Sequence, residues 1–211
     1  MNPIRLLLRM ATKGLLHFLR LAPRLSVRLA GRISGNGKLA AYASRPWMVQ
    51  RLGNALLNNG ILIAQLNVTN ACNEKCPMCN LWEEGSRMPL DRARLCLDRI
   101  AELGAFILTI TGGEPFTHPD IGEIIDYARD KQFFLNLNTN ASLPLKVYRR
   151  ADLNKIDLAI VSFHAMDERK LARITGVGNT LPRVLETLRY FRDETSMRVI
   201  LKFVVQRDNA D

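Results

Sequence analysis

Residues 61–79 read ILIAQLNVTNACNEKCPMC, an apolar run followed at once by a loop with three cysteines. The length and apolar character of the run predict a buried strand. Three thiolates at the spacing of Cys72, Cys76 and Cys79 can hold an iron–sulfur cluster and leave one iron without a protein ligand. Such an iron is open to a cofactor or substrate that accepts an electron. The stretch therefore predicts a strand that ends in a catalytic metal loop.

The chain after Gly60 alternates short apolar runs with helical stretches of mixed charge, which is typical of βα units around a parallel sheet. We expect strands near 61–68, 106–111, 133–139, 156–163 and 198–205, and helices over 90–103, 119–131, 144–153 and 179–194. Right-handed connections place the helices outside the strands. The sequence predicts an α/β fold with a partial barrel of parallel strands.

Polar residues and glycines follow the predicted strands at the same rim. TGGEP (111–115) follows the second strand, Asn138 and Asn140 close the third, and Ser162 and His164 close the fourth. The carboxyl ends of barrel strands gather their loops around one opening. We therefore expect these residues to share a site with the cysteines.

The composition suits one main globular domain, because 211 residues with 47% hydrophobic content can bury a core. Four cysteines in a chain of this length are too few for a disulfide scaffold. Three of them cluster at metal-ligand spacing, which indicates a reducing compartment. We expect a cytoplasmic protein.

The net charge of +10 comes entirely from the N-terminal residues of the chain. Residues 1–60 hold ten Lys or Arg and no acidic residue, and residues 61–211 hold twenty of each sign. We predict two parts: a basic amphipathic helical segment over 1–57 and a catalytic core over 58–211.

Basic residues recur every fourth position in this first segment, with apolar residues between them. The pattern predicts amphipathic helices over about 4–21 and from Pro23 to about Ile33. Arginines interrupt every apolar stretch, so no transmembrane span is expected. Residues 1–33 suit contact with an anionic membrane surface at the inner face, packing against the core or a partner, or a targeting presequence. Nucleic acid is less favoured, because no interleaved aromatic residues support base stacking.

CNEKCPMC after a first strand and TGGEP after a second resemble the radical S-adenosylmethionine (radical SAM) superfamily from Ile61 to Asp211. NTNAS (138–142) and SFHAMDERKLARITG (162–176) are similar to its branch of molybdenum-cofactor-biosynthesis and peptide-modifying (SPASM-type) enzymes. The resemblance implies a partial (β/α)6 barrel. The chain stops before a sixth βα unit, so we expect either a truncated chain or a partner that completes the barrel.

The resemblance also implies the cofactors. Cys72, Cys76 and Cys79 would bind three irons of a [4Fe–4S] cluster, and S-adenosylmethionine (SAM) would chelate the fourth. An external one-electron reductant, flavodoxin- or ferredoxin-like, would supply the electron that cleaves SAM to a 5′-deoxyadenosyl radical. That radical would abstract hydrogen from a substrate, which could be a peptide, a cofactor precursor or a lipid.

The family's SAM contacts transfer to matching positions, and no general acid or base is assigned. The implied cofactor-binding residues are Gly112, Gly113, Glu114 and Pro115 at the methionyl ammonium, Asn138 and Ser162 at the ribose or carboxylate, and Met78 at the adenine. Asn140 suits a turn cap equally well. His164 suits a structural role at the rim at least as well as contact with substrate or proton transfer. Gln206 lies near the last rim, where it could reach the cofactor.

Two alternatives from other classes stay open. A zinc site needs a fourth ligand, but Cys96 is expected to be a buried thiol on a helix and His118 belongs to another loop. An iron–sulfur electron carrier normally uses four cysteines and needs neither GGEP nor a barrel. A zinc-stabilised RNA- or membrane-binding module would explain only the basic segment.

Overall fold

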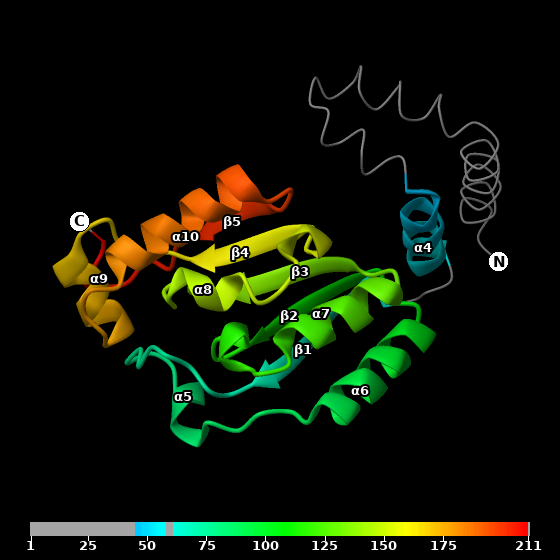
Figure 1. Cartoon of the computed structure of the whole chain (residues 1–211), viewed down its shortest axis with the longest axis horizontal. Helices are drawn as coiled ribbons and strands as arrows, with labels where there is room; N and C mark the ends of the chain where they lie inside the picture. The colour runs from blue at the N-terminus through cyan, green and yellow to red at the C-terminus, as the bar shows by residue number, and fades with distance from the viewer. Residues whose placement is uncertain (1–44, 58–60, 211) are drawn as a thin grey trace, which may run out of the picture. The chain divides into compact units, whose positions relative to one another are not determined.

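The computed structural model describes residues 45–57 and 61–210, and its main feature is a five-stranded sheet in the order β1-β2-β3-β4-β5 (Figure 1). The pairs β2–β3, β3–β4 and β4–β5 are parallel. The strands are β1 (Ile63–Thr69), β2 (Ile107–Gly112), β3 (Phe134–Thr139), β4 (Leu158–Ser162) and β5 (Arg198–Lys202). The predicted α/β fold with a partial barrel of sequential strands is confirmed.

Helices connect the strands. They are α4 (Pro46–Leu57), α5 (Leu81–Glu84), α6 (Leu90–Glu102), α7 (Ile121–Asp130), α8 (Leu145–Tyr148), α9 (Glu168–Thr175) and α10 (Leu181–Glu194). Within the described residues, none of them is both long and apolar enough to cross a membrane.

The chain divides into two compact units. One contains the residues up to Ile63 together with Ile100–Phe106, and the other contains Ala64–Arg99 and Ile107–Asp211. The helices expected over 4–33 lie outside the described residues. The boundary expected near residue 57 stays a prediction.

Alternation along β2 and β3 separates an apolar face from a largely polar face. Leu108, Ile110, Leu135, Leu137 and Val161 are fully buried on the first face. Helix α7 lies against β3, and α10 lies against β5. On the other face two cross-strand pairs are polar: the Asn136 amide donates to Thr109 at 3.5 Å, and the Asn138 amide donates to Thr111 at 3.4 Å. The polar face leads to the functional site.

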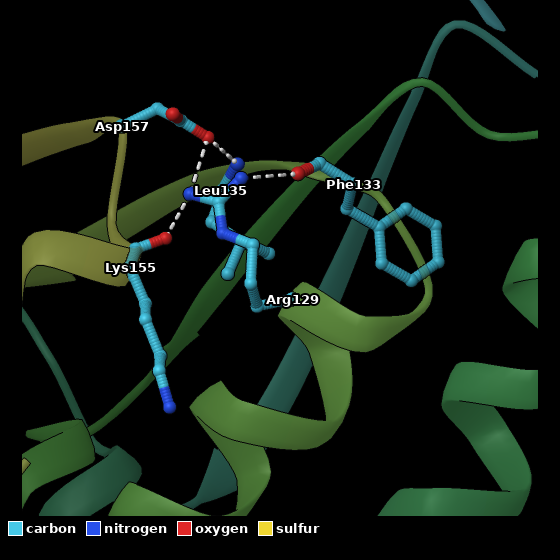
Figure 2. Close-up of polar contacts among 5 residues, drawn as sticks. All are labelled: Arg129, Phe133, Leu135, Lys155 and Asp157. Carbon is cyan, nitrogen blue, oxygen red and sulfur yellow. Dashed lines mark hydrogen bonds and ion pairs between the residues drawn. The ribbon is translucent and has the colours of Figure 1, made fainter. Parts of the chain in front are cut away.

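An ion pair with a buried carboxylate joins α7 to the two neighbouring strands where they begin (Figure 2). The Oδ2 of Asp157 accepts from Arg129 Nη2 at 2.9 Å and from the backbone N–H of Leu135 at 2.8 Å. Arg129 also donates to the carbonyl of Phe133 at 3.3 Å and to the carbonyl of Lys155. The pair ties the end of α7 to the starts of β3 and β4.

The helix predicted over 144–153 is wrong in extent. Helix α8 ends after one turn, and a separate 3-10 turn covers Leu153–Lys155. Asp152 has an extended backbone there, and its side chain accepts from the N–H of Asn154 at 3.1 Å. This cap starts the 3-10 turn, so the segment contains two short helical pieces in place of one helix.

Helix α9 was not predicted, although its end signals stand in the sequence. The side chain of Asp167 accepts from the N–H of Lys170 at 2.8 Å, and Gly176 ends the helix with a φ of 69°. An aspartate N-cap and a glycine after the last turn are the usual boundaries of a helix.

Strand β5 is shorter than predicted, because it ends at Lys202 and not at residue 205.

Candidate functional site

The loops after β1, β2, β3 and β4, together with the end of β5, surround a cavity of about 310 Å³. The residues expected in the site that line it are Cys72, Cys76, Cys79, Met78, Gly112, Gly113, Asn138 and Ser162, and Asn140 and His164 join them. Thr111, expected at this rim with the rest of TGGEP, also lines it, as do five residues that sequence reasoning did not select: Glu74, Leu81, Trp82, Thr139 and Lys202. Gln206 does not line the cavity.

The cysteine loop, residues 70–79, is held by backbone hydrogen bonds to two other loops. The N–H groups of Gly113 and Glu114 donate to the carbonyls of Thr69 and Ala71 at 2.7 and 2.9 Å. The N–H of Lys75 donates to the carbonyl of Thr175, at the end of α9, at 2.9 Å. The position of the cysteines therefore depends on both the GGEP loop and α9.

The two glycines are needed because the loops approach each other closely. A Cβ added at Gly112 would lie 2.1 Å from the carbonyl oxygen of Thr69, and one added at Gly113 would lie 2.4 Å from that of Ala71. Gly112 also has a φ of 148°, which a side chain disfavours. Sequence reasoning explained the glycines by the approach of a ligand, and the structure adds the approach of the cysteine loop.

Glu114 and Pro115 are buried and do not line the cavity, although they were expected among the cofactor contacts. The carboxylate of Glu114 accepts from the backbone N–H of Phe116 at 3.2 Å and of Asn140 at 2.8 Å. The hydroxyl of Thr139 lies 3.0 and 2.9 Å from its two oxygens. Burial raises the pKa of Glu114 to about 7, against the effect of these donors. Glu114 thus joins the loop after β2 to the end of β3.

Four polar side chains, here called the Asn140 network, connect the end of β3 to the cysteine loop: Asn73, Glu74, Asn140 and Ser142. Asn140 Nδ2 donates to Asn73 Oδ1 at 2.9 Å, and Asn73 Nδ2 donates to Ser142 Oγ at 2.8 Å. The Ser142 hydroxyl donates to Glu74 Oε1 at 2.7 Å. Sequence reasoning missed this network, because its members come from distant segments and each alone suits an ordinary turn.

The cysteine sulfurs have different neighbours. Cys72 Sγ accepts from the backbone N–H of Glu74 at 3.4 Å and lies 3.8 Å from Asn140 Nδ2. Cys76 Sγ lies 3.8 Å from Glu74 Oε2. Burial raises the pKa of the Cys72 thiol to about 11 and that of the Cys76 thiol to about 12, and the Glu74 charge adds to both. A bound cation would favour the thiolates over the thiols.

The donor set fits an iron–sulfur cluster with an open iron. Three thiols from one loop line the same cavity, whereas Cys96 is half-buried on α6 and does not line it. The expectation of a buried Cys96 is therefore only partly met, because its thiol lies near the edge of the apolar stripe. Both ring nitrogens of His118 have backbone partners and are not directed at the cysteines. Nε2 donates to the carbonyl of Met88 at 2.7 Å, and Nδ1 accepts from the N–H of Asp120 at 3.1 Å.

A single-ion centre has less support. Among the residues that the structure describes, no group of three His, Cys, Asp or Glu side chains could hold one metal ion.

The far wall of the cavity comes from β4 and β5. Ser162 is in register with Lys202, and both residues line the cavity. His164 Nδ1 accepts from the backbone N–H of Val204 at 3.3 Å. Burial, and then the charge of Lys202, lower the pKa of His164, so this imidazole is neutral at pH 7. Sequence reasoning missed Lys202 because it placed this residue inside a fifth strand over 198–205, whereas β5 ends at Lys202.

Comparisons with known proteins agree with this geometry. The chain matches the radical SAM superfamily over residues 66–205. It is 33% identical over 157 residues to the PqqA peptide cyclase of Gluconobacter oxydans, covering 71% of this chain and 42% of that protein. It is 29% identical over 168 residues to a probable GTP 3′,8-cyclase of Saccharolobus solfataricus, covering 78% of this chain and 53% of that protein. The chain thus spans about half or less of the length of these relatives.

Solved structures show the same fold. The Streptococcus suis protein SuiB bound to S-adenosylmethionine is similar with a TM-score of 0.59 and 17% identity, covering 77% of this chain and 40% of SuiB. SuiB bound to the precursor peptide SuiA is similar with a TM-score of 0.59 and 19% identity, covering 82% of this chain and 39% of SuiB. The [4Fe–4S] cluster and SAM are the cofactors of this enzyme family. The resemblance in the sequence is confirmed: the chain belongs to the radical SAM superfamily.

Proposed function

We propose that this chain is the catalytic core of a radical SAM enzyme that binds a [4Fe–4S] cluster through Cys72, Cys76 and Cys79. One observation carries the proposal: the three thiols share a cavity of about 310 Å³ with the ends of the next four strands. When bound, the cluster would supply one electron for the reductive cleavage of SAM to methionine and a 5′-deoxyadenosyl radical, and this radical would abstract hydrogen from substrate. The electron comes from an external donor, flavodoxin- or ferredoxin-like.

The residues that line the cavity would position SAM over the open iron. Gly112 and Gly113 line the cavity beside the cysteines and would contact the methionyl group, and Asn138 and Ser162 offer hydrogen bonds to the ribose or carboxylate. Met78 is half exposed at the cavity and can pack against the adenine. Glu114 and Pro115 act from behind this wall by holding the GGEP loop in place.

A peptide is the favoured substrate class. Two similar proteins support this choice. The relative that is 33% identical is named PqqA peptide cyclase, and the structure of SuiB contains a bound precursor peptide. GTP is the alternative that the second relative suggests. A lipid has only the basic front segment in its favour.

Anaerobic reconstitution tests the proposal. The wild-type chain should take up iron and sulfide, change its electron paramagnetic resonance (EPR) spectrum when SAM is added, and release 5′-deoxyadenosine with dithionite. Cys76→Ser should lose the cluster, whereas Cys96→Ser, outside the cavity, should keep it. A mononuclear zinc protein, or a cluster whose spectrum ignores SAM, would refute the assignment.

For the basic segment over 1–57 we propose contact with anionic membrane through residues 1–33, with the core over 58–211 remaining cytoplasmic. Ten cations without an acidic residue over 1–60 support this. Flotation with anionic liposomes should recover the full chain but not a chain without residues 1–55. Equal recovery of both would refute it.

A further inference from the structure

We propose that Asn140 is a positioning residue for the cluster: its amide donates to the sulfur of Cys72 and thereby raises the reduction potential of the cluster. The inference rests on the proposed function, because it needs a cluster bound at the three cysteines. It assigns a role to a side chain that is not itself an iron ligand.

The carboxamide of Asn140 has one orientation that satisfies all its neighbours. Oδ1 accepts from the N–H of Ser142 at 3.0 Å, and it lies 3.0 Å from the Ser142 hydroxyl, whose single hydrogen goes to Glu74. Nδ2 donates one hydrogen to Asn73 Oδ1 at 2.9 Å and directs the other toward Cys72 Sγ at 3.8 Å. A flipped amide would place its oxygen against Asn73 Oδ1 and the sulfur. With only 8% of Asn140 exposed, little water competes for these bonds.

The donors gather on one cysteine. Cys72 Sγ receives the backbone N–H of Glu74 at 3.4 Å as well as the Asn140 amide. Cys76 Sγ faces a carboxylate oxygen of Glu74 at 3.8 Å instead. Hydrogen bonds to cluster sulfurs stabilise the more negative, reduced state and so raise the potential. Asn140 therefore favours reduction at the Cys72 corner.

Three variants of the full chain distinguish two roles of Asn140: a hydrogen bond to the sulfur of Cys72, and holding the cysteine loop in place. Asn140→Asp keeps the acceptor for Ser142 and replaces the donor with an anionic oxygen. Asn140→Leu removes the donor without adding charge. Ser142→Ala is the matched control, because it breaks the Asn140 network at its centre and leaves the amide beside Cys72.

The measurement is a potentiometric titration of the reconstituted cluster, followed by EPR without SAM. At a fixed poise, Asn140→Asp should lower the ratio of reduced to oxidised cluster about tenfold, which is about 59 mV for one electron. Asn140→Leu should lower it by a smaller factor. Ser142→Ala should hold less cluster per chain but keep the wild-type midpoint.

Unchanged midpoints in both Asn140 variants would overturn the inference, and so would an equal shift in Ser142→Ala. Loss of the cluster from both Asn140 variants, with retention in Ser142→Ala, would limit Asn140 to holding the loop and would also overturn it. A wild-type chain that assembles no [4Fe–4S] cluster would instead contradict the proposed function. The two failures are therefore distinguishable.

Discussion

Glu114 shows how a single residue of the GGEP motif can serve the fold and the site together. Its carboxylate is fully buried and accepts hydrogen bonds from two backbone N–H groups. Burial raises its pKa to about 7 from an ordinary value of 4.5. The Thr139 hydroxyl beside it can accept as well as donate, so a protonated Glu114 also has a partner. Both protonation states are therefore accommodated.

This raised pKa predicts a pH-dependent stability for the metal-free chain. Between about pH 4.5 and 7 the folded chain holds a proton on Glu114 that the unfolded chain has lost. The stabilisation is therefore complete below pH 4.5 and is lost as the pH rises through 7. Glu114→Gln cannot ionise, although its NH2 group takes the place of one carboxyl oxygen and removes the acceptor of one backbone N–H at every pH.

In urea unfolding, the free energy of unfolding of Glu114→Gln minus that of the wild type should increase as the pH rises from 4.5 through 7, because only the wild type loses stability over this range. Comparison with the wild type cancels the titration of other carboxylates, including Glu74. A difference that does not vary with pH would contradict the prediction.

At the scale of elements, the end of α9 supports the cysteine loop. Gly176 has a φ of 69°, and a Cβ there would lie 2.3 Å from the carbonyl oxygen of Lys75. The residue therefore meets two requirements, a left-handed helix end and a close approach to the cysteine loop. A glycine that follows α5, Gly85, meets only the first: its φ is 62°, and nothing lies within 4 Å of an added Cβ.

We predict that Gly176→Ala lowers the iron bound per chain after reconstitution at least about twofold, because the cysteine loop must move. Its stability should fall by more than the roughly 1 kcal/mol that left-handed strain alone causes. Gly85→Ala should show that strain but bind a normal amount of iron. Equal iron content in the two variants would mean that α9 does not position the cysteines.

The ion pair of Arg129 and Asp157 stabilises the amino ends of β3 and β4, whereas the cavity lies at the carboxyl ends of the strands (Figure 2). Arg129→Met leaves a carboxylate of which 2% is exposed, and such changes cost about 3–5 kcal/mol. The exposed pair of Arg192 and Asp193 is the control, because Arg192→Met should leave the free energy of unfolding nearly unchanged. Urea denaturation measures both. Arg129→Met chains that remain folded should keep the wild-type EPR response to SAM, because the ion pair lies at the other end of the strands from the site. A lost response would show that the ion pair also affects the site.

At the scale of the whole molecule, the two ends of the strands have different tasks. The cavity lies at the carboxyl ends of the strands, and the buried ion pair lies at the amino ends of β3 and β4. A ligand that binds only the folded site stabilises the segments that contact it. Removing the cluster should therefore affect the two ends unequally.

Hydrogen exchange measured with and without the reconstituted cluster checks this. Amides of residues 70–79, 112–116 and 139–142 should lose protection about tenfold or more when the cluster is removed. Amides of 133–135 and 155–158 should change by less than about twofold. Equal loss at both ends would indicate that the cluster stabilises the fold globally.

The sequence by itself determined the elements and the chemistry of their ends. Alternating apolar runs and helical stretches predicted five parallel strands, and the cysteine spacing with GGEP indicated the superfamily. These properties are local, because strand periodicity and loop composition are set by neighbouring residues. For the same reason α9 was predictable in principle from Asp167 and Gly176.

Only the tertiary structure decided which side chains meet. It placed Glu114 behind the cavity wall, brought Lys202 into the cavity and joined Asn140 to Cys72. These contacts join segments far apart in the chain, and each depends on the angle at which a loop leaves its strand. Local sequence sets which groups can donate or accept, but the packing of loops against one another determines the partner of each group.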